Sequence, residues 1–155
     1  MTAAPDYTHK RYLDDLVVGD QFLSGHYEMT AAEIKDFAQR YDPQPFHLDE
    51  VAAAQSFFQG LAASGWHTAG VTMRLLVQTL PLAAGIVGAE TTTSWPRPTR
   101  PGDVLNVVAT LKEIKPSHSK PDRGMITLYC ETFNQNQQVV QKLTAKLLVF
   151  RRPAA

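Results

Sequence analysis

The chain has 155 residues, of which 44% are hydrophobic, and this size and composition fit one domain with a sizeable core. Fifteen basic and fifteen acidic side chains give a formal net charge of zero, which argues against nucleic acid as the main partner. The single cysteine, Cys130, excludes an internal disulfide, and no apolar run approaches the roughly 18 residues that a membrane span needs. We therefore expect a cytoplasmic protein of one domain over residues 1–155, with an ordered core at about 10–151, mobile ends and no membrane partner.

Helices are predicted in the first half of the chain, after a strand over residues 21–29. A capping-box pattern at Thr30 and helical spacing of the apolar residues after it predict a helix to residue 41. A short helix is predicted over 49–55, capped by Asp49. The longest helix is predicted to begin at residues 64–65 and to end at Pro81. Its apolar stripe, which we expect to be buried, is Trp66, Ala69, Gly70, Met73, Leu76, Val77 and Leu80.

Strands are predicted in the second half, where the period of the apolar residues changes to two. Three segments alternate clearly, at 105–111, 126–131 and 143–149, and a further strand is predicted over 90–97. The sequence at 134–137 favours a hairpin turn. The predicted fold is therefore α+β, an antiparallel sheet whose strands lie mainly after one long buried helix.

One short segment carries a candidate catalytic pair, Asp42 and His47, which are separated by five positions. Pro43 and Pro45 lie between them, and each restricts its own backbone and that of the preceding residue. We expect a rigid, solvated loop in which neither Asp42 nor Gln44 is helical. A carboxylate and an imidazole held at a preset distance suit proton transfer near neutral pH.

Three blocks of the sequence resemble the MaoC-like dehydratases, relatives of the (R)-specific enoyl-CoA hydratases, which adopt the hot-dog fold. Residues 41–50, Tyr-Asp-Pro-Gln-Pro-Phe-His-Leu-Asp-Glu, are similar to the hydratase motif Asp-x-Asn-Pro-x-His-x-Asp. Residues 56–60 and 63–68 are similar to the entry into the family's central helix, and residues 95–103 to the start of a core strand. The chain departs from the family at Gln44, where Asn is typical, and at Ser64-Gly65, where His-Gly is typical.

The resemblance implies reversible hydration of a trans-2-enoyl-CoA to a (R)-3-hydroxyacyl-CoA. Asp42 and His47 would activate one water, and the backbone N–H of Gly65 would bind the thioester oxygen. The implied assembly is a homodimer or a set of dimers, with an acyl-CoA substrate. The sequence has no metal-binding or dinucleotide-binding motif, so we expect no metal and no redox cofactor. The other residues expected to contact substrate are Gln44, Phe46, Ser64, Trp66, His67 and, at the CoA phosphates, Lys120 and Arg123.

Other interpretations of the same residues remain open. Ser64 also fits a helix N-cap, Gly65 a turn position, and Trp66 and His67 packing against the core. Lys120 and Arg123 also fit solvated charges in a basic connection expected over 116–124. The competing functions are a hot-dog acyl-CoA thioesterase, which would release free thiol, and a non-catalytic acyl-CoA-binding subunit.

Overall fold

A computed structural model describes residues 10–154 of the chain. The helices in this part of the chain are the 3₁₀ turn η1 (Leu13–Asp15), α1 (Ala31–Tyr41), α2 (Pro45–Leu48), α3 (Glu50–Ala54) and α4 (Gly65–Thr79). The strands are β1 (Gln21–Leu23), β2 (Tyr27–Glu28), β3 (Val87–Ser94), β4 (Val104–Pro116), β5 (Arg123–Phe133) and β6 (Val139–Phe150). None of these helices is both long and apolar enough to cross a membrane.

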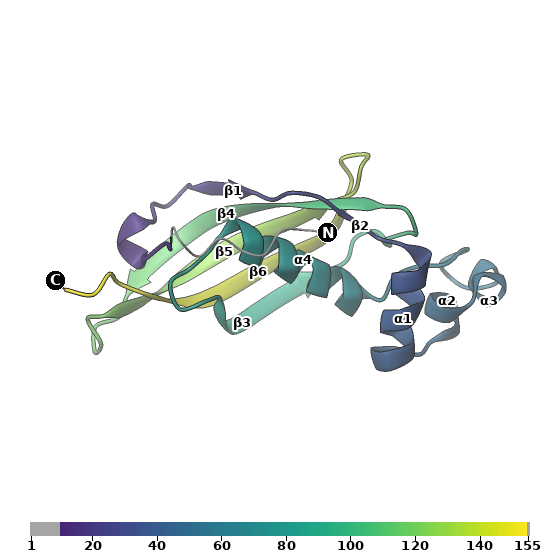
Figure 1. Ribbon diagram of the computed structural model, residues 1–155, viewed down its shortest axis with the longest axis horizontal. Coiled ribbons are helices and arrows are strands. Elements are labelled where there is room, and N and C mark those ends of the chain that lie inside the picture. Colours follow the sequence, from purple (N-terminus) through teal and green to yellow (C-terminus); the bar gives the residue numbers. More distant parts are fainter. Residues whose placement is uncertain (1–9, 155) are drawn as a thin grey trace.

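The strands form one antiparallel sheet, and α4 lies along its inner face (Figure 1). The order is β1-β4-β5-β6-β3, and β2 also pairs with β4. The core lies between the helix and the sheet. Every second residue of β4, from Leu105 to Leu111, is buried in one cluster with Val71, Leu75 and Leu76 of α4. This α+β arrangement confirms the predicted fold class and the alternation that predicted β4, β5 and β6.

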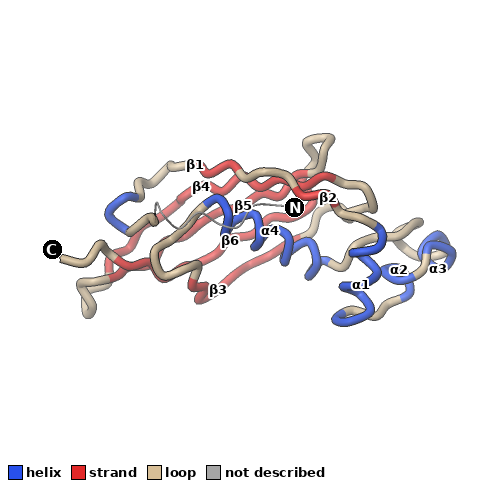
Figure 2. Tube along the Cα trace, viewed as in Figure 1, coloured by secondary structure: helices blue, strands red, loops and turns tan. Residues whose placement is uncertain are grey.

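The three short helices α1, α2 and α3 gather at one end of the sheet, beyond the N-terminus of α4 (Figure 2). α1 begins with Thr30, whose side chain accepts a hydrogen bond from Glu33 N, and α3 begins with Asp49, whose side chain accepts from Val51 N. Both caps confirm the predicted starts of these helices. The helical end also receives the segment that follows β3, so it combines residues from three parts of the chain.

The strand predicted over 21–29 is interrupted. Leu23 pairs with Val108 and Tyr27 with Leu105, so the three residues 24–26 lie opposite the two residues 106–107 of β4. Ser24 fills this bulge, because its hydroxyl accepts a hydrogen bond from Val107 N at 2.7 Å. The strand predicted over 90–97 lies instead at 87–94. Pro96 and Pro98 have no N–H to continue a ladder, which explains the earlier end.

The predicted apolar stripe of α4 is wrong in part, because the buried face is rotated around the helix. Trp66 is 64% exposed and Met73 41% exposed, whereas Thr68 and Thr72 are buried. The hydroxyl of Thr72 donates to the backbone of its own helix at Thr68 O and pairs with Thr132 of β5 at 2.7 Å. Buried threonines are therefore part of the contact between α4 and the sheet, and counting apolar residues could not identify them.

The C-terminal segment is more ordered than expected. Arg152, placed by the sequence in a mobile end, donates to both carboxylate oxygens of Asp15 at 2.8 Å and lies over the Tyr12 ring. Arg151 pairs with Asp14 at 3.0 Å. The mobility expected for residues 1–9 concerns a segment outside the described residues.

Candidate active site

The segment that carries Asp42 and His47 is partly helical, which corrects the expectation of a loop. Asp42 is the non-helical C-cap that follows α1, and Gln44 has extended backbone and precedes α2, as the two prolines predicted. Pro45 is the first residue of α2, a position where proline lacks only an N–H that would be unpaired in any case. His47 lies in this single helical turn and is only 4% exposed, so it is not a solvated side chain.

The two ring nitrogens of His47 have different partners. Nδ1 lies 2.6 Å from Ala62 O, and because a carbonyl oxygen can only accept, Nδ1 must carry a hydrogen. Nε2 lies 3.2 Å from Oδ2 of Asp42. When the imidazole is neutral, Nε2 and Oδ2 are both acceptors, and a water that donates to both would satisfy them. When the imidazole is protonated, Nε2 donates to Asp42 directly.

Asp42 lies in a setting that keeps its carboxyl group ionised. Partial burial acts to raise the pKa of Asp42, but the Gln44 amide, the Ser64 hydroxyl and His47 together lower this pKa below its ordinary value. Gln44 Nε2 donates a short hydrogen bond, of 2.6 Å, to Oδ1 of Asp42. Gln44 therefore binds the carboxylate oxygen that does not face His47, and it leaves Oδ2 for the pair.

Asp42 and His47 line a hollow of about 640 Å³ at the helical end of the molecule. Its wall is strongly aromatic. The Phe46 ring packs on His47 at 4.6 Å and on Phe58 at 5.0 Å between ring centroids, and the Trp66 and Trp95 rings lie 5.4 Å apart. The remaining lining residues are Gln44, Phe57, Ala63, Gly65, Thr68, Pro96, Arg97, Pro98 and Thr99. A hollow of this volume has the size of a small-molecule site.

Gly65 is the first residue of α4 and lines the same hollow. Within residues 10–154 its N–H has no hydrogen-bond partner, as is usual for the first turn of a helix. A Cβ at this position would meet the Trp95 ring at 2.7 to 3.0 Å. Glycine is thus required here because Trp95 packs against the backbone, which the sequence did not indicate. Ser64 is buried and caps the helix by accepting from Trp66 N at 3.3 Å.

A buried polar network holds the Trp95 indole in place. Its Nε1 donates to Gln141 Oε1 at 2.8 Å, and Gln141 Nε2 donates to Thr72 Oγ1 at 3.1 Å. Gln141 is fully buried. The indole that covers Gly65 is therefore held by β6 and α4 at once, and its position depends on the packing of the whole sheet.

The structure does not bring His67 into this hollow. Its ring is buried against α1, stacked on Phe37 at 4.8 Å with an interplanar angle of 5°. Its Nδ1 is buried without a hydrogen-bond partner, and burial lowers the pKa of His67 more than the nearby Glu33 raises it. His67 therefore occupies a packing position within the described chain.

Lys120 and Arg123 lie at the opposite end of the sheet from Asp42 (Figure 1). Arg123 is the first residue of β5, so the basic connection is shorter than predicted. Its guanidinium pairs with Asp122 at 2.9 Å and lies over the Phe150 ring at 5.0 Å. Within one chain, neither residue meets the Asp42 hollow, and contact with a CoA bound there would need a second chain.

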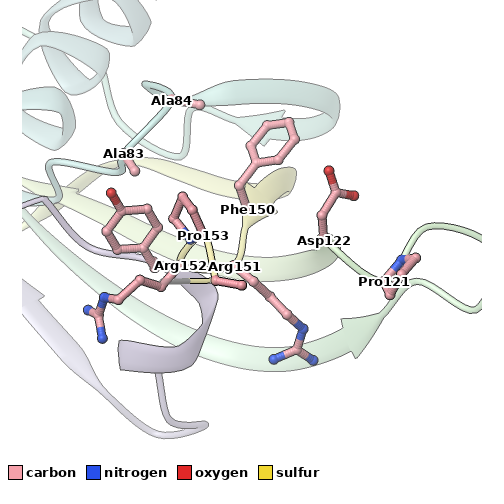
Figure 3. Close-up of a pocket in the computed structure, with 10 residues that line it drawn as sticks. Ala83, Ala84, Pro121, Asp122, Phe150, Arg151, Arg152 and Pro153 are labelled. Carbon is pink, nitrogen blue, oxygen red and sulfur yellow. The ribbon is translucent and has the colours of Figure 1, made fainter.

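A second hollow, of about 630 Å³, lies at this far end (Figure 3). Figure 3 shows Phe150, Arg151, Arg152 and Pro153 of the C-terminal segment beside Ala83 and Ala84. Its two arginines are already paired with carboxylates. We therefore assign the site to the first hollow.

Two contributors to the site were missed by sequence reasoning. The Ala62 carbonyl sets the hydrogen on His47, but a backbone group carries no signal in the sequence. Trp95 covers Gly65, and its presence in a block similar to the family's core-strand entry could have identified it. No cluster of three potential metal ligands among His, Cys, Asp and Glu occurs in the described residues. Cys130 is buried, which raises the pKa of its thiol to about 12.

Comparison with known proteins supports the resemblance over the whole fold. Residues 17–129 match the family model described as MaoC like domain. The chain is 59% identical to a MaoC-like dehydratase from Rhodospirillum rubrum of known structure, with a TM-score of 0.91 over 93% of this chain and 99% of that one. It is 26% identical to the (R)-hydratase from A. caviae involved in PHA biosynthesis, with a TM-score of 0.69 over 88% of this chain and 98% of that one.

A relative known from its sequence has similar coverage. The uncharacterized protein YdeM of Bacillus subtilis (strain 168) is 26% identical over 141 residues, which are 90% of this chain and 99% of YdeM. The six-stranded sheet around α4 is thus the hot-dog fold of these dehydratases. The chain belongs to the family of proteins with a MaoC-like domain.

Proposed function

We propose that this protein is a hydro-lyase that adds water to a trans-2-enoyl-CoA and forms a (R)-3-hydroxyacyl-CoA, and that it also catalyses the reverse dehydration. The observation that carries the proposal is the pair of acceptors at the hollow. His47 Nε2 and Asp42 Oδ2 lie 3.2 Å apart, and the Nδ1 hydrogen is held by Ala62 O. A single water that donates to both atoms has its oxygen lone pairs directed away from them, toward a substrate.

The proposed reaction moves one water across the double bond. The water oxygen bonds to C3, the base pair takes one water hydrogen, and this hydrogen is returned to C2 on the same face. Negative charge develops on the thioester oxygen between these events. The unpaired N–H of Gly65, at the N-terminus of α4, is the proposed donor to that oxygen, and the helix dipole favours negative charge there.

We propose a homodimer built through β3. This strand is at the edge of the sheet and pairs only with β6 within the described chain, and nearly all of its residues are exposed. An edge strand of eight residues offers unpaired backbone groups to a second copy. Val87, Met73 and Trp66 are large exposed apolar side chains near this edge, which favours burial in an assembly. A cytoplasmic location and the absence of a cofactor stay predictions.

The test follows the absorbance of the conjugated thioester when purified protein meets a short trans-2-enoyl-CoA. A parallel reaction contains a thiol reagent, and the Asp42→Asn variant is the control. Loss of absorbance without thiol release, abolished in the variant, would support the proposal. Thiol release would favour a thioesterase instead, and no change with a panel of acyl lengths would favour a binding role.

A further inference from the structure

We propose that Arg100 is a positioning residue for the reaction: it holds the segment 58–62 so that Ala62 O fixes the hydrogen on His47 Nδ1. The inference rests on the function proposed above. Arg100 touches neither Asp42 nor His47, and it follows Pro98 and Thr99 on the far wall of the hollow. Its effect on the reaction would be transmitted through the backbone.

The guanidinium of Arg100 binds only backbone oxygens in the described part of the chain. Its Nη1 donates to Gly60 O at 2.9 Å and to Leu61 O at 3.2 Å, and its Nη2 donates to Phe58 O. No carboxylate of residues 10–154 lies within ion-pair distance of this cation. A charged side chain is thus used entirely to hold three carbonyl groups of one short segment, which indicates that their placement matters.

The segment that Arg100 holds has an unusual backbone. Gln59 has a φ of 54°, in the left-handed region that disfavours residues with a side chain, and Gly60 has a φ of 155°. A Cβ at Gly60 would lie 3.3 Å from Nη1 of Arg100, so the guanidinium is close against the backbone. Without the arginine, three carbonyls of a strained turn would lose their donors, and the segment would be free to relax.

The same segment leads directly to His47. Ala62 O accepts the Nδ1 hydrogen at 2.6 Å, while Ala62 N donates to Phe46 O at 3.1 Å, so the residue is bound to α2 from both sides. Ala63 N then donates to Thr99 O at 2.9 Å, which ties the segment to the connection between β3 and β4 that carries Arg100. A shift of the backbone after Leu61 would therefore move the acceptor that selects the His47 tautomer.

The position of Arg100 is itself fixed by a buried carboxylate. Arg100 N donates to Asp103 Oδ2 at 2.8 Å, and Asp103 Oδ1 accepts from Gln135 at 3.0 Å. Asp103 is buried, so the turn from which the guanidinium extends is rigid. A lysine at position 100 could not make the same three contacts, because one ammonium group lacks the planar fork with which a guanidinium spans several carbonyls.

The test combines kinetics with nuclear magnetic resonance of histidine side chains in Arg100→Ala and Arg100→Lys. Arg151→Ala is the matched control, since it removes an arginine whose partner, Asp14, lies at the other end of the sheet. We expect kcat to fall by about 10- to 10²-fold in Arg100→Ala, with KM changed less than about threefold, because a small displacement of a catalytic group is sufficient for such a loss. Added guanidinium at millimolar concentration should restore part of kcat.

The spectroscopic readout does not depend on activity. In ¹⁵N-labelled protein, the His47 signal, assigned by its absence in His47→Gln, should show hydrogen on Nδ1 in the parent protein and a mixture of tautomers in Arg100→Ala. Unchanged tautomer and kcat in both Arg100 variants would overturn the inference. If Arg100→Ala does not fold, the same readouts on Arg100→Lys decide. If the parent protein hydrates no enoyl-CoA but the tautomer still depends on Arg100, the proposed function fails and the positioning role stands.

Discussion

The two hollows at opposite ends of the sheet have nearly the same volume, about 640 and 630 Å³, and very different chemistry. The hollow at the helical end contains Asp42 and a buried His47, and Oδ2 of Asp42 lies 3.2 Å from Nε2 of His47. The hollow at the far end contains Arg151 and Arg152, each of which already has a carboxylate partner (Figure 3). Both ends carry charged side chains, but of these two hollows only the first places a histidine beside a carboxylate.

This difference shows that size alone does not identify a site. Charged pairs at the far end are partly exposed, so their contribution to binding or stability is small and sensitive to salt. At the helical end, burial and fixed hydrogen bonds hold Asp42 and His47 in one geometry before substrate arrives. The predictions below are changes at one end or the other that should keep, remove or reverse this contrast.

The largest expected effect is the loss of the acceptor pair. Asp42→Asn and His47→Gln should each lower turnover by about 10²- to 10⁴-fold, because each removes a partner in proton transfer. The measurement is kcat on an enoyl-CoA, with circular dichroism to check the fold. Arg152→Ala, at the far hollow, is the control and should keep the parent kcat. Near-parent turnover in both Asp42→Asn and His47→Gln would contradict the mechanism.

Gly65→Ala should be the next most harmful change. The new Cβ would lie 2.7 to 3.0 Å from the Trp95 ring, so the indole must move and strain its bond to Gln141. We expect a loss of about 1 to 3 kcal/mol in the free energy of unfolding, measured with urea, together with lower activity.

The double variant Gly65→Ala, Trp95→Leu separates the space that Gly65 provides from its N–H. Trp95→Leu itself costs stability, because Gln141 loses its donor, but adding Gly65→Ala should cost less stability in the Trp95→Leu background than in the parent protein, since the smaller side chain leaves room for the new Cβ. Equal stability of Gly65→Ala and the parent protein would show that the contact with Trp95 is unimportant.

A smaller effect on stability is expected from His67→Phe, a change at the ring that stacks on Phe37 of α1. Burial lowers the pKa of His67 below its ordinary 6.5, so the folded protein keeps this ring neutral where the unfolded chain already binds a proton. Below about pH 6.5 the parent protein therefore loses stability as pH falls, down to the lowered pKa.

The measurement is the free energy of unfolding at pH 7.5 and pH 5.5. The decrease between the two should be smaller in His67→Phe, whose ring fits the same stack on Phe37. An identical decrease in both proteins would show that His67 does not contribute to the pH dependence.

Arg123→Ala should have the smallest effect. Its charge is already neutralised by Asp122, and it lies far from Asp42 in the same chain. We expect KM for the CoA substrate to change less than about threefold, as for an exposed pair of little energetic weight. A rise in KM of tenfold or more would instead support a second chain that brings Arg123 to the CoA phosphates.

Sequence patterns predicted the fold where one physical rule dominated. The strict alternation at 105–111 and 126–131 can only place one face in a core, and both segments are strands in the structure. The predicted bounds of α4 are confirmed, but its predicted buried face is wrong in part, because Thr68 and Thr72 are buried through hydroxyl hydrogen bonds that no hydrophobic pattern reveals. The short helix α2 was missed because Pro45 also fits a helix start.

The sequence predicted the parts of the candidate site that side chains provide, but not the parts that backbone groups provide. The spacing of Asp42 and His47 around two prolines indicated a rigid pair, and the structure brings them to 3.2 Å. Ala62 O and the Arg100 contacts were not predictable, because they depend on backbone groups brought together by folding. Lys120 and Arg123 were selected by charge alone, and charge does not indicate at which end of a sheet a residue lies.

The central claim is that Asp42 and His47 add water to the double bond of a CoA thioester, and oxygen-18 labelling tests it most directly. The protein is incubated with a short trans-2-enoyl-CoA in water enriched in oxygen-18, and the products are separated by mass spectrometry. We predict one labelled oxygen at C3 of an intact hydroxyacyl-CoA, formed by the parent protein and nearly absent with Asp42→Asn. Label in a free carboxylate, with release of CoA, would contradict this mechanism.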